Sequence, residues 1–104
     1  MTESISTAER SRILVIDDDG YFITMVKNGL KDICDVTATT RAMDGLKLAS
    51  QKPLPDLILL DIMMPGLSGY QICRELKQNP VTYGIPVIFV SGGGKECKTR
   101  RNKN

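Results

Sequence analysis

The chain has 104 residues, of which 41% are hydrophobic and 25% charged, and such values are typical of a single compact globular domain. It contains no histidine, which excludes histidine metal sites, Ser–His–Asp triads and a histidine general base. No stretch reaches the roughly 18 apolar residues of a membrane span, and the polar start has no signal-peptide core. We therefore expect a cytoplasmic protein without membrane contact.

Charge and cysteine are unevenly distributed along the chain. Residues 92–104 carry five basic side chains and one acidic one, so the remainder has a net charge of −2 although the whole chain has +2. Short basic runs are usually solvated, and this one does not favour nucleic-acid binding.

The three cysteines, Cys34, Cys73 and Cys97, are odd in number and widely spaced. We expect free thiols and neither a disulfide framework nor a cysteine metal site.

The apolar pattern predicts alternating strands and helices. After a polar lead at residues 1–11 come a buried strand (12–16), a helix (21–31), a weaker strand (35–39), a second helix (41–51), a buried strand (57–60), a third helix (70–79) and a fourth strand (85–90). Strands that alternate with helices of about ten residues imply right-handed crossovers and a parallel sheet covered on both faces. The predicted fold class is therefore α/β, with a doubly wound parallel sheet.

Polar residues follow three of the predicted strands where each strand ends. Asp17, Asp18 and Asp19 follow the first strand, Asp61 the third and Ser91 the fourth. In open parallel sheets, ligands bind at the edge where these strand ends meet. Two carboxylates about 4 Å apart repel by roughly 4 kcal/mol at an effective dielectric of 20, and a divalent cation removes this repulsion. Oxygen ligands suit Mg²⁺, beside which an aspartate can attack phosphorus, whereas Asp19 taken alone is better explained as a helix cap.

Three segments resemble the receiver domains of two-component response regulators, in the same order and with similar spacing. They are residues 13–19 (ILVIDDD), 57–77 (LILLDIMMPGLSGYQICRELK) and 85–92 (IPVIFVSG). The resemblance covers residues 12–92, which we interpret as an incomplete receiver domain followed by a basic, flexible tail at 93–104. It implies a flavodoxin-like receiver fold that lacks the last α/β units.

The resemblance also implies roles for individual residues. Asp61 would be the phosphoacceptor and a metal ligand. Asp18 would bind Mg²⁺ directly, Asp17 would act through metal-bound water, and Met63 would contribute its backbone carbonyl. Ser91 would bond the phosphoryl oxygen as part of the catalytic site. Gly92, the small residue beside it, would leave room for the phosphodonor at the phosphate-binding position.

The residues after Ser91 depart from the family pattern. They read GGGKECKTRRNKN, without a strand-like run and without the Lys-Pro pair that ends the family's fifth strand. We therefore expect the fourth strand to form a bare hydrophobic edge. Homodimerisation through that edge is one consequence, and a truncated product with a disrupted reading frame is the other interpretation.

These features predict a signalling switch and not an enzyme. Asp61 would accept a phosphoryl group from a histidine kinase or phosphotransfer protein in a Mg²⁺-dependent way. Because the family's lysine is missing, the alternative is a degenerate receiver that is not phosphorylated and serves as an interaction or dimerisation module. A Mg²⁺-dependent phosphohydrolase resembling haloacid dehalogenases is a further alternative, but such enzymes have a second aspartate at the position of Met63.

Overall fold

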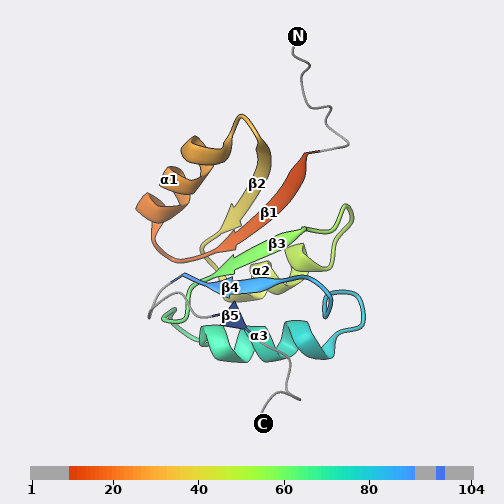
Figure 1. Cartoon of the computed structure of the whole chain (residues 1–104). Helices are drawn as coiled ribbons and strands as arrows, with labels where there is room; N and C mark the ends of the chain where they lie inside the picture. Colours follow the sequence, from red (N-terminus) through yellow and green to blue (C-terminus); the bar gives the residue numbers. More distant parts are fainter. Residues whose placement is uncertain (1–9, 91–95, 98–104) are drawn as a thin grey trace.

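The computed structural model describes residues 10–90 and the backbone of residues 96–97, and these residues form a five-stranded sheet with three helices (Figure 1). The strands are β1 (Ser11–Ile16), β2 (Cys34–Thr39), β3 (Leu57–Leu60), β4 (Val87–Phe89) and β5 (Glu96–Cys97). The helices are α1 (Gly20–Leu30), α2 (Ala42–Ala49) and α3 (Gly69–Gln78). The strand order is β2-β1-β3-β4-β5, and the first four strands are parallel, which confirms the predicted α/β class.

Local side-chain caps fix where two of the helices begin. Asp19 is the N-cap of α1, where its Oδ1 accepts the N–H groups of Tyr21 at 2.9 Å and Phe22 at 3.4 Å. Ser68 and Gln71 form a reciprocal capping box at the start of α3. Such caps satisfy backbone donors that have no partner inside the helix. Both helices therefore start directly after the loops that follow β1 and β3.

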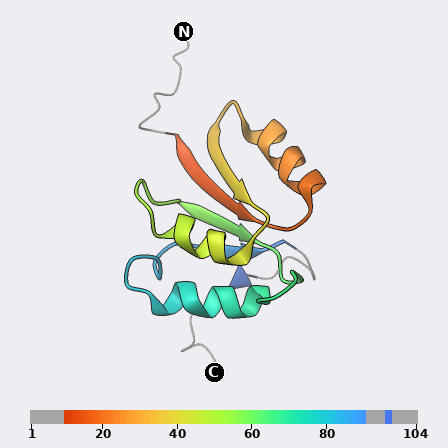
Figure 2. The same cartoon turned by 180° about the vertical axis from the view of Figure 1, so that it is seen from behind.

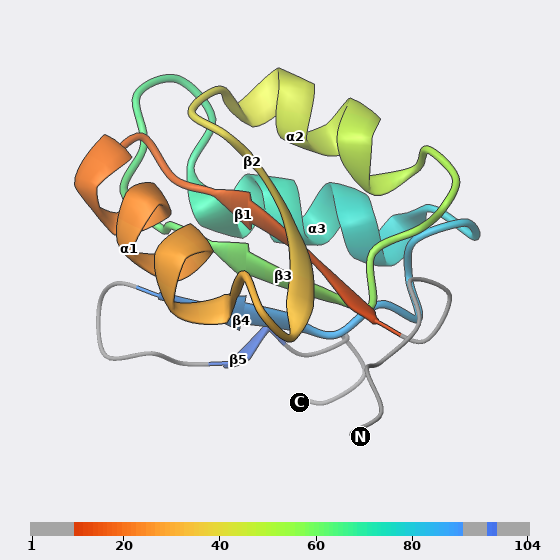
Figure 3. The ribbon, with the colours of Figure 1, turned by 90° about the horizontal axis from the view of Figure 1, so that it is seen from above.

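The hydrophobic core lies between the sheet and one pair of helices. Figure 2 shows α2 and α3 together on one face of the sheet, and Figure 3 shows α1 on the other. Side chains of alternate strand residues fill the space below α2 and α3, with members from every parallel strand except β2: Leu14, Ile16, Ile58, Leu60, Val87 and Phe89. Helix α3 adds Ile72 and Leu76, which are almost completely buried. This layer makes the carboxyl edge of the sheet a rigid platform.

The helix α1 is less buried than its apolar pattern predicts. Phe22, Met25, Val26 and Leu30 recur at helical spacing, yet no residue of α1 is buried and Met25 is 63% exposed. Helix α1 packs chiefly against β2, which lies at the edge of the sheet. A helix over an edge strand has less apolar surface beneath it than one over the centre, and this explains the difference.

Two expectations about the end of the chain and the cysteines are corrected. The fourth strand was expected to be a bare edge, but β5 pairs antiparallel with β4 and matches Val87 with Cys97 and Ile88 with Glu96. Backbone pairing of two residues needs no apolar run, so the sequence pattern gives no sign of it.

Cys34 is a free thiol as predicted, whereas Cys73 is disulfide-bonded, so the expectation of free thiols is wrong for Cys73.

No helix in the described part of the chain is long and apolar enough to cross a membrane.

Candidate functional site

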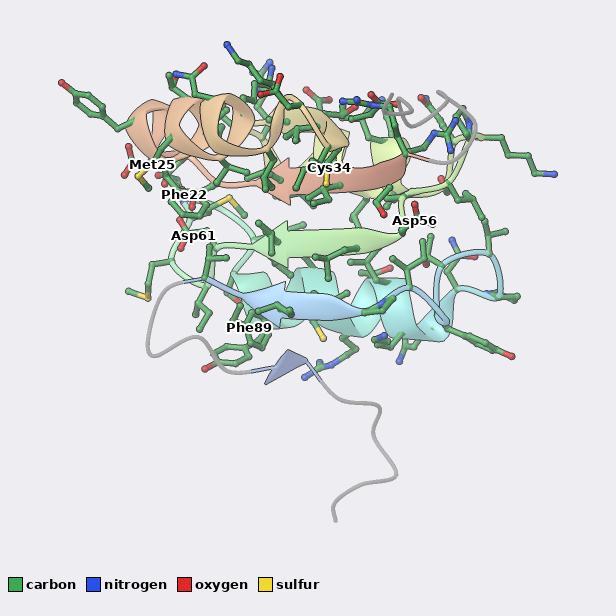
Figure 4. All side chains as sticks on the ribbon, turned by 45° about the horizontal axis from the view of Figure 1, so that its top comes forward. Phe22, Met25, Cys34, Asp56, Asp61 and Phe89 are labelled. Carbon is green, nitrogen blue, oxygen red and sulfur yellow. The ribbon has the colours of Figure 1, made fainter. Side chains whose placement is uncertain are left out.

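The register of the sheet brings two of the predicted aspartates side by side. The parallel strands β1 and β3 pair Ile16 with Leu60, so the residues that follow, Asp17 and Asp61, leave the sheet at the same level. The N–H of Asp61 donates to the carbonyl of Ile16 at 2.8 Å, and that of Asp17 to the carbonyl of Thr39 at 3.1 Å. Backbone pairing therefore holds both residues at the carboxyl edge, where Asp61 is seen in Figure 4.

The carboxylates of Asp17, Asp18 and Asp61 form one cluster. A carboxylate oxygen from each residue lies within 4.8 Å of the other two. Asp17 and Asp61 are only 5% and 6% exposed, whereas Asp18 is exposed. The Oδ1 atom of Asp61 accepts the N–H of Met63 at 3.0 Å, and this hydrogen bond helps to orient its carboxylate. The cluster thus has two buried members and one that faces solvent.

Burial also changes the acidity of the cluster. The pKa of Asp17 is raised from 3.8 to about 6, chiefly because burial disfavours its charged form. Repulsion from Asp61, a hydrogen bond with the Asp61 side chain and repulsion from Asp18 add to this rise. The N–H of Asp19, which donates to Asp17 Oδ1 at 2.8 Å, opposes it. The cluster therefore favours a state with fewer negative charges than three ionised carboxylates would carry.

A magnesium ion fits this donor set. Mg²⁺ prefers oxygen ligands, and octahedral bonds of about 2.1 Å place those oxygens roughly 3 to 4 Å apart. The observed limit of 4.8 Å lies close to that range, so small side-chain movements would complete the site. A divalent cation would offset two of the three negative charges and relieve the repulsion that raises the pKa of Asp17.

The loop after Asp61 is shaped by two glycines. Gly66 has a φ of 85°, in the left-handed region where a side chain would be strained. The N–H of Gly69 donates to the carbonyl of Ile62 at 2.9 Å. A Cβ atom on Gly69 would lie only 2.5 Å from the carbonyl oxygen of Asp61. The first residue of α3 therefore packs directly against the backbone of the candidate phosphoacceptor.

The structure places some of the predicted site residues and not others. Asp17, Asp18 and Asp61 converge, and Asp19 caps α1 instead of joining them. Met63 is 75% exposed, and the metal contact expected from its backbone carbonyl stays a prediction. Ser91 and Gly92 lie outside the described residues.

Sequence reasoning missed the backbone groups that support the cluster. The carbonyls of Ile16 and Thr39 hold the two buried aspartates, yet a carbonyl is common to every residue and leaves no pattern. The close approach of Gly69 to the backbone of Asp61 depends on how α3 packs, so the sequence does not reveal it. The one signal in the sequence that could have indicated this contact is the glycine itself, which has no Cβ atom.

Comparisons with known proteins agree on one family. The family model described as the response regulator receiver domain matches residues 13–103. Protein PilH of Pseudomonas aeruginosa is 38% identical over 91 residues, which cover 83% of this chain and 71% of PilH. Response regulator PleD of Caulobacter vibrioides is 40% identical over 84 residues, which cover 78% of this chain and 18% of PleD.

A solved structure shows the same arrangement of elements. The N-terminal domain of a response regulator receiver protein from Methanoculleus marisnigri has a TM-score of 0.70 and 30% sequence identity, over 75% of this chain and 63% of that one. With its parallel β2-β1-β3-β4 order and its acidic cluster, the chain belongs to the response regulator receiver domain family. The matched segment covers only 20% and 18% of the length of the first two curated relatives, so the chain spans about a fifth of those proteins.

Proposed function

We propose that the protein is a phosphoryl-accepting switch of two-component signalling, in which Asp61 takes the phosphoryl group with Mg²⁺ as cofactor. The observation that carries this proposal is the cluster of Asp17, Asp18 and Asp61 at the carboxyl edge of a receiver sheet. The phosphodonor would be the phosphohistidine of a histidine kinase or phosphotransfer protein. The cytoplasmic location predicted from the sequence remains a prediction.

The geometry of Asp61 suits a nucleophile towards phosphorus. Its backbone is held by the carbonyl of Ile16, and its Oδ1 is oriented by the N–H of Met63. Fixed orientation lowers the entropic part of the barrier to a displacement reaction. The side chain is nearly buried, so few water molecules compete with a docked phosphodonor. Asp17 is held in a similar way, so the choice of Asp61 rests on its place after β3, which matches the phosphoacceptor of the receiver family.

The other two aspartates would hold the metal ion. Asp18 is the exposed member, so an ion bound there would stay accessible to a phosphoryl group that arrives from solvent. Bound Mg²⁺ supplies positive charge that shields the phosphoryl oxygens from the carboxylates. Asp17 would contribute its buried negative charge, and the Asp19 N–H would keep its carboxylate in place. The carbonyl of Met63, the hydroxyl of Ser91 and the space at Gly92 remain further predicted parts of the site.

Beryllofluoride, a stable mimic of an aspartyl phosphate, tests the proposal. The protein is titrated with beryllofluoride in the presence and absence of Mg²⁺ while amide NMR shifts are recorded. We expect saturable, Mg²⁺-dependent shifts at Asp61, Met63 and Gly69. Asp61→Asn should abolish them, and the control Asp32→Asn, an exposed residue outside the cluster, should not.

A different result would favour the non-phosphorylated interaction module. If the folded protein binds Mg²⁺ but shows no beryllofluoride response, the phosphoacceptor role is wrong. If the response is the same in Asp61→Asn, the site of the adduct is wrong.

A further inference from the structure

A cavity lies at the end of the sheet opposite to the acidic cluster. It has a volume of about 380 Å³ and is lined by β1, β2, the last part of α2 and the loop before β3. Figure 4 shows Asp56 and Asp61 at opposite ends of β3. The N–H of Arg12, a lining residue, donates to Asp56 Oδ2 at 2.8 Å, which places the cavity at the Asp56 end. It is therefore separate from the candidate phosphorylation site.

Several of the residues that line this cavity are apolar. Leu48 is half-buried and packs against the main core, whereas Leu14 is only 2% exposed and contributes little accessible surface. Pro53 and Pro55 also line the cavity, and the proline ring fixes its own φ angle. Such a surface can receive the flat apolar part of a small molecule with little rearrangement.

The polar side of the cavity carries excess positive charge. Arg12 and Lys52 both line it, and neither forms an ion pair within the part of the chain that the structure describes. The acidic residue on the lining, Asp35, is already paired with Arg10, whose Nε lies 2.9 Å from Asp35 Oδ1. The pairing of β1 with β2 places Arg12 opposite Asp35 and Leu14 opposite Thr37, so these charged and apolar groups lie on the same face of the sheet. The lining thus combines two cations with apolar side chains.

We propose that this cavity binds a small organic anion with a flat apolar body, of the aromatic carboxylate class. The apolar part would lie on Leu48, Pro53 and Pro55, and the carboxylate would face Arg12 and Lys52. Cavities of roughly 300 to 1,000 Å³ with apolar walls and a few polar groups are the usual size for small-molecule sites. The ligand chemistry follows from the two cations, because a neutral or cationic molecule would leave their charge without a partner.

The probes are 1-naphthoate and its neutral analogue 1-naphthalenemethanol, which share one ring system and differ in charge. Binding is followed by amide NMR shifts of the full chain. We expect saturable shifts at Leu14, Thr37 and Lys52. Naphthoate should bind about twofold to 25-fold more tightly than the alcohol, because each of the two charge pairs adds a factor of roughly 1.4 to 5.

Two double variants with the same change in net charge separate the cavity from general attraction. Arg12→Gln/Lys52→Gln should remove the preference for naphthoate, whereas Lys31→Gln/Lys47→Gln, both exposed and outside the lining, should keep it. Equal affinity for the two probes, equal loss in both variants, or shifts confined to Leu59 and Ile88 on the other face would overturn the proposal. Retained NMR spectra of the free variants show that each one is folded.

Discussion

The substitution Asp17→Asn should stabilise the protein when Mg²⁺ is absent. The pKa of Asp17 is about 6 in the folded chain against an ordinary 3.8, so the folded state binds this proton more tightly than the unfolded state does. Stability is therefore gained as the pH falls from about 6 towards 4, and it is lost at higher pH. A difference of about two pKa units corresponds to roughly 3 kcal/mol, which is the upper limit of the cost of the ionised group at pH 7.5.

Asparagine keeps the shape of the side chain and removes this cost. Its Oδ1 can still accept the Asp19 N–H that bonds Asp17 at 2.8 Å, and its amide can donate to Asp61. We expect the free energy of unfolding to rise by about 1 to 3 kcal/mol at pH 7.5, with the gain disappearing near pH 4.

Urea denaturation followed by circular dichroism measures this change, with Asp32→Asn as the exposed control. The control should change the free energy of unfolding by less than about 0.5 kcal/mol. With saturating Mg²⁺ the wild type should regain stability, because a ligand that binds only the folded state stabilises it. A lower stability of Asp17→Asn at pH 7.5 without Mg²⁺ would refute the account of the cluster as a site of repulsion.

Three further predictions concern the loop, an ion pair and pH. Gly69→Ala should lower the free energy of unfolding, measured by urea denaturation, by about 1 to 3 kcal/mol, because the new Cβ would lie 2.5 Å from the Asp61 carbonyl oxygen. Gly29 has open space around it, so Gly29→Ala should raise the free energy of unfolding by about 0.5 to 1 kcal/mol. Equal effects of the two would contradict the close packing of α3. Arg10→Ala should lower the free energy of unfolding by about 1 to 3 kcal/mol in the same assay. The Arg10 guanidinium donates hydrogen bonds to Asp35 and to the carbonyls of Lys31, Asp32 and Cys34, and the variant loses all of them. A smaller loss in Arg10→Lys would show how much the ion pair contributes alone. Mg²⁺ affinity measured by calorimetry should fall as the pH drops below about 6, because protons compete with the ion at Asp17, and a pH-independent affinity would exclude Asp17 from the metal site.

Most of the fold could be predicted because the signals are local. The strand at residues 57–60 was predicted with the bounds that the structure gives, since an uninterrupted apolar run ends there in an aspartate. The remaining helix and parallel-strand boundaries differ by at most two residues at either end, as is usual where ends fray. The convergence of Asp17 and Asp61 followed from topology alone, because parallel strands end at the same edge.

The features that could not be predicted depend on contacts between distant segments. The pairing of β5 with β4 involves two backbone positions and no apolar pattern. The exposure of Met25 depends on α1 lying over the edge strand β2, and the bonded state of Cys73 depends on three-dimensional proximity. The raised pKa of Asp17 likewise requires its burial, which the sequence pattern of three aspartates does not reveal.

The central claim is that Asp61 accepts a phosphoryl group in the presence of Mg²⁺. The most direct measurement is tandem mass spectrometry of the protein after incubation with acetyl phosphate and Mg²⁺, with Asp61→Asn and a sample containing EDTA as controls. We predict a single phosphoryl group on Asp61 in the wild type and none in either control. A wild-type protein that remains folded and binds Mg²⁺ but carries no phosphoryl group on Asp61 would contradict the proposed function.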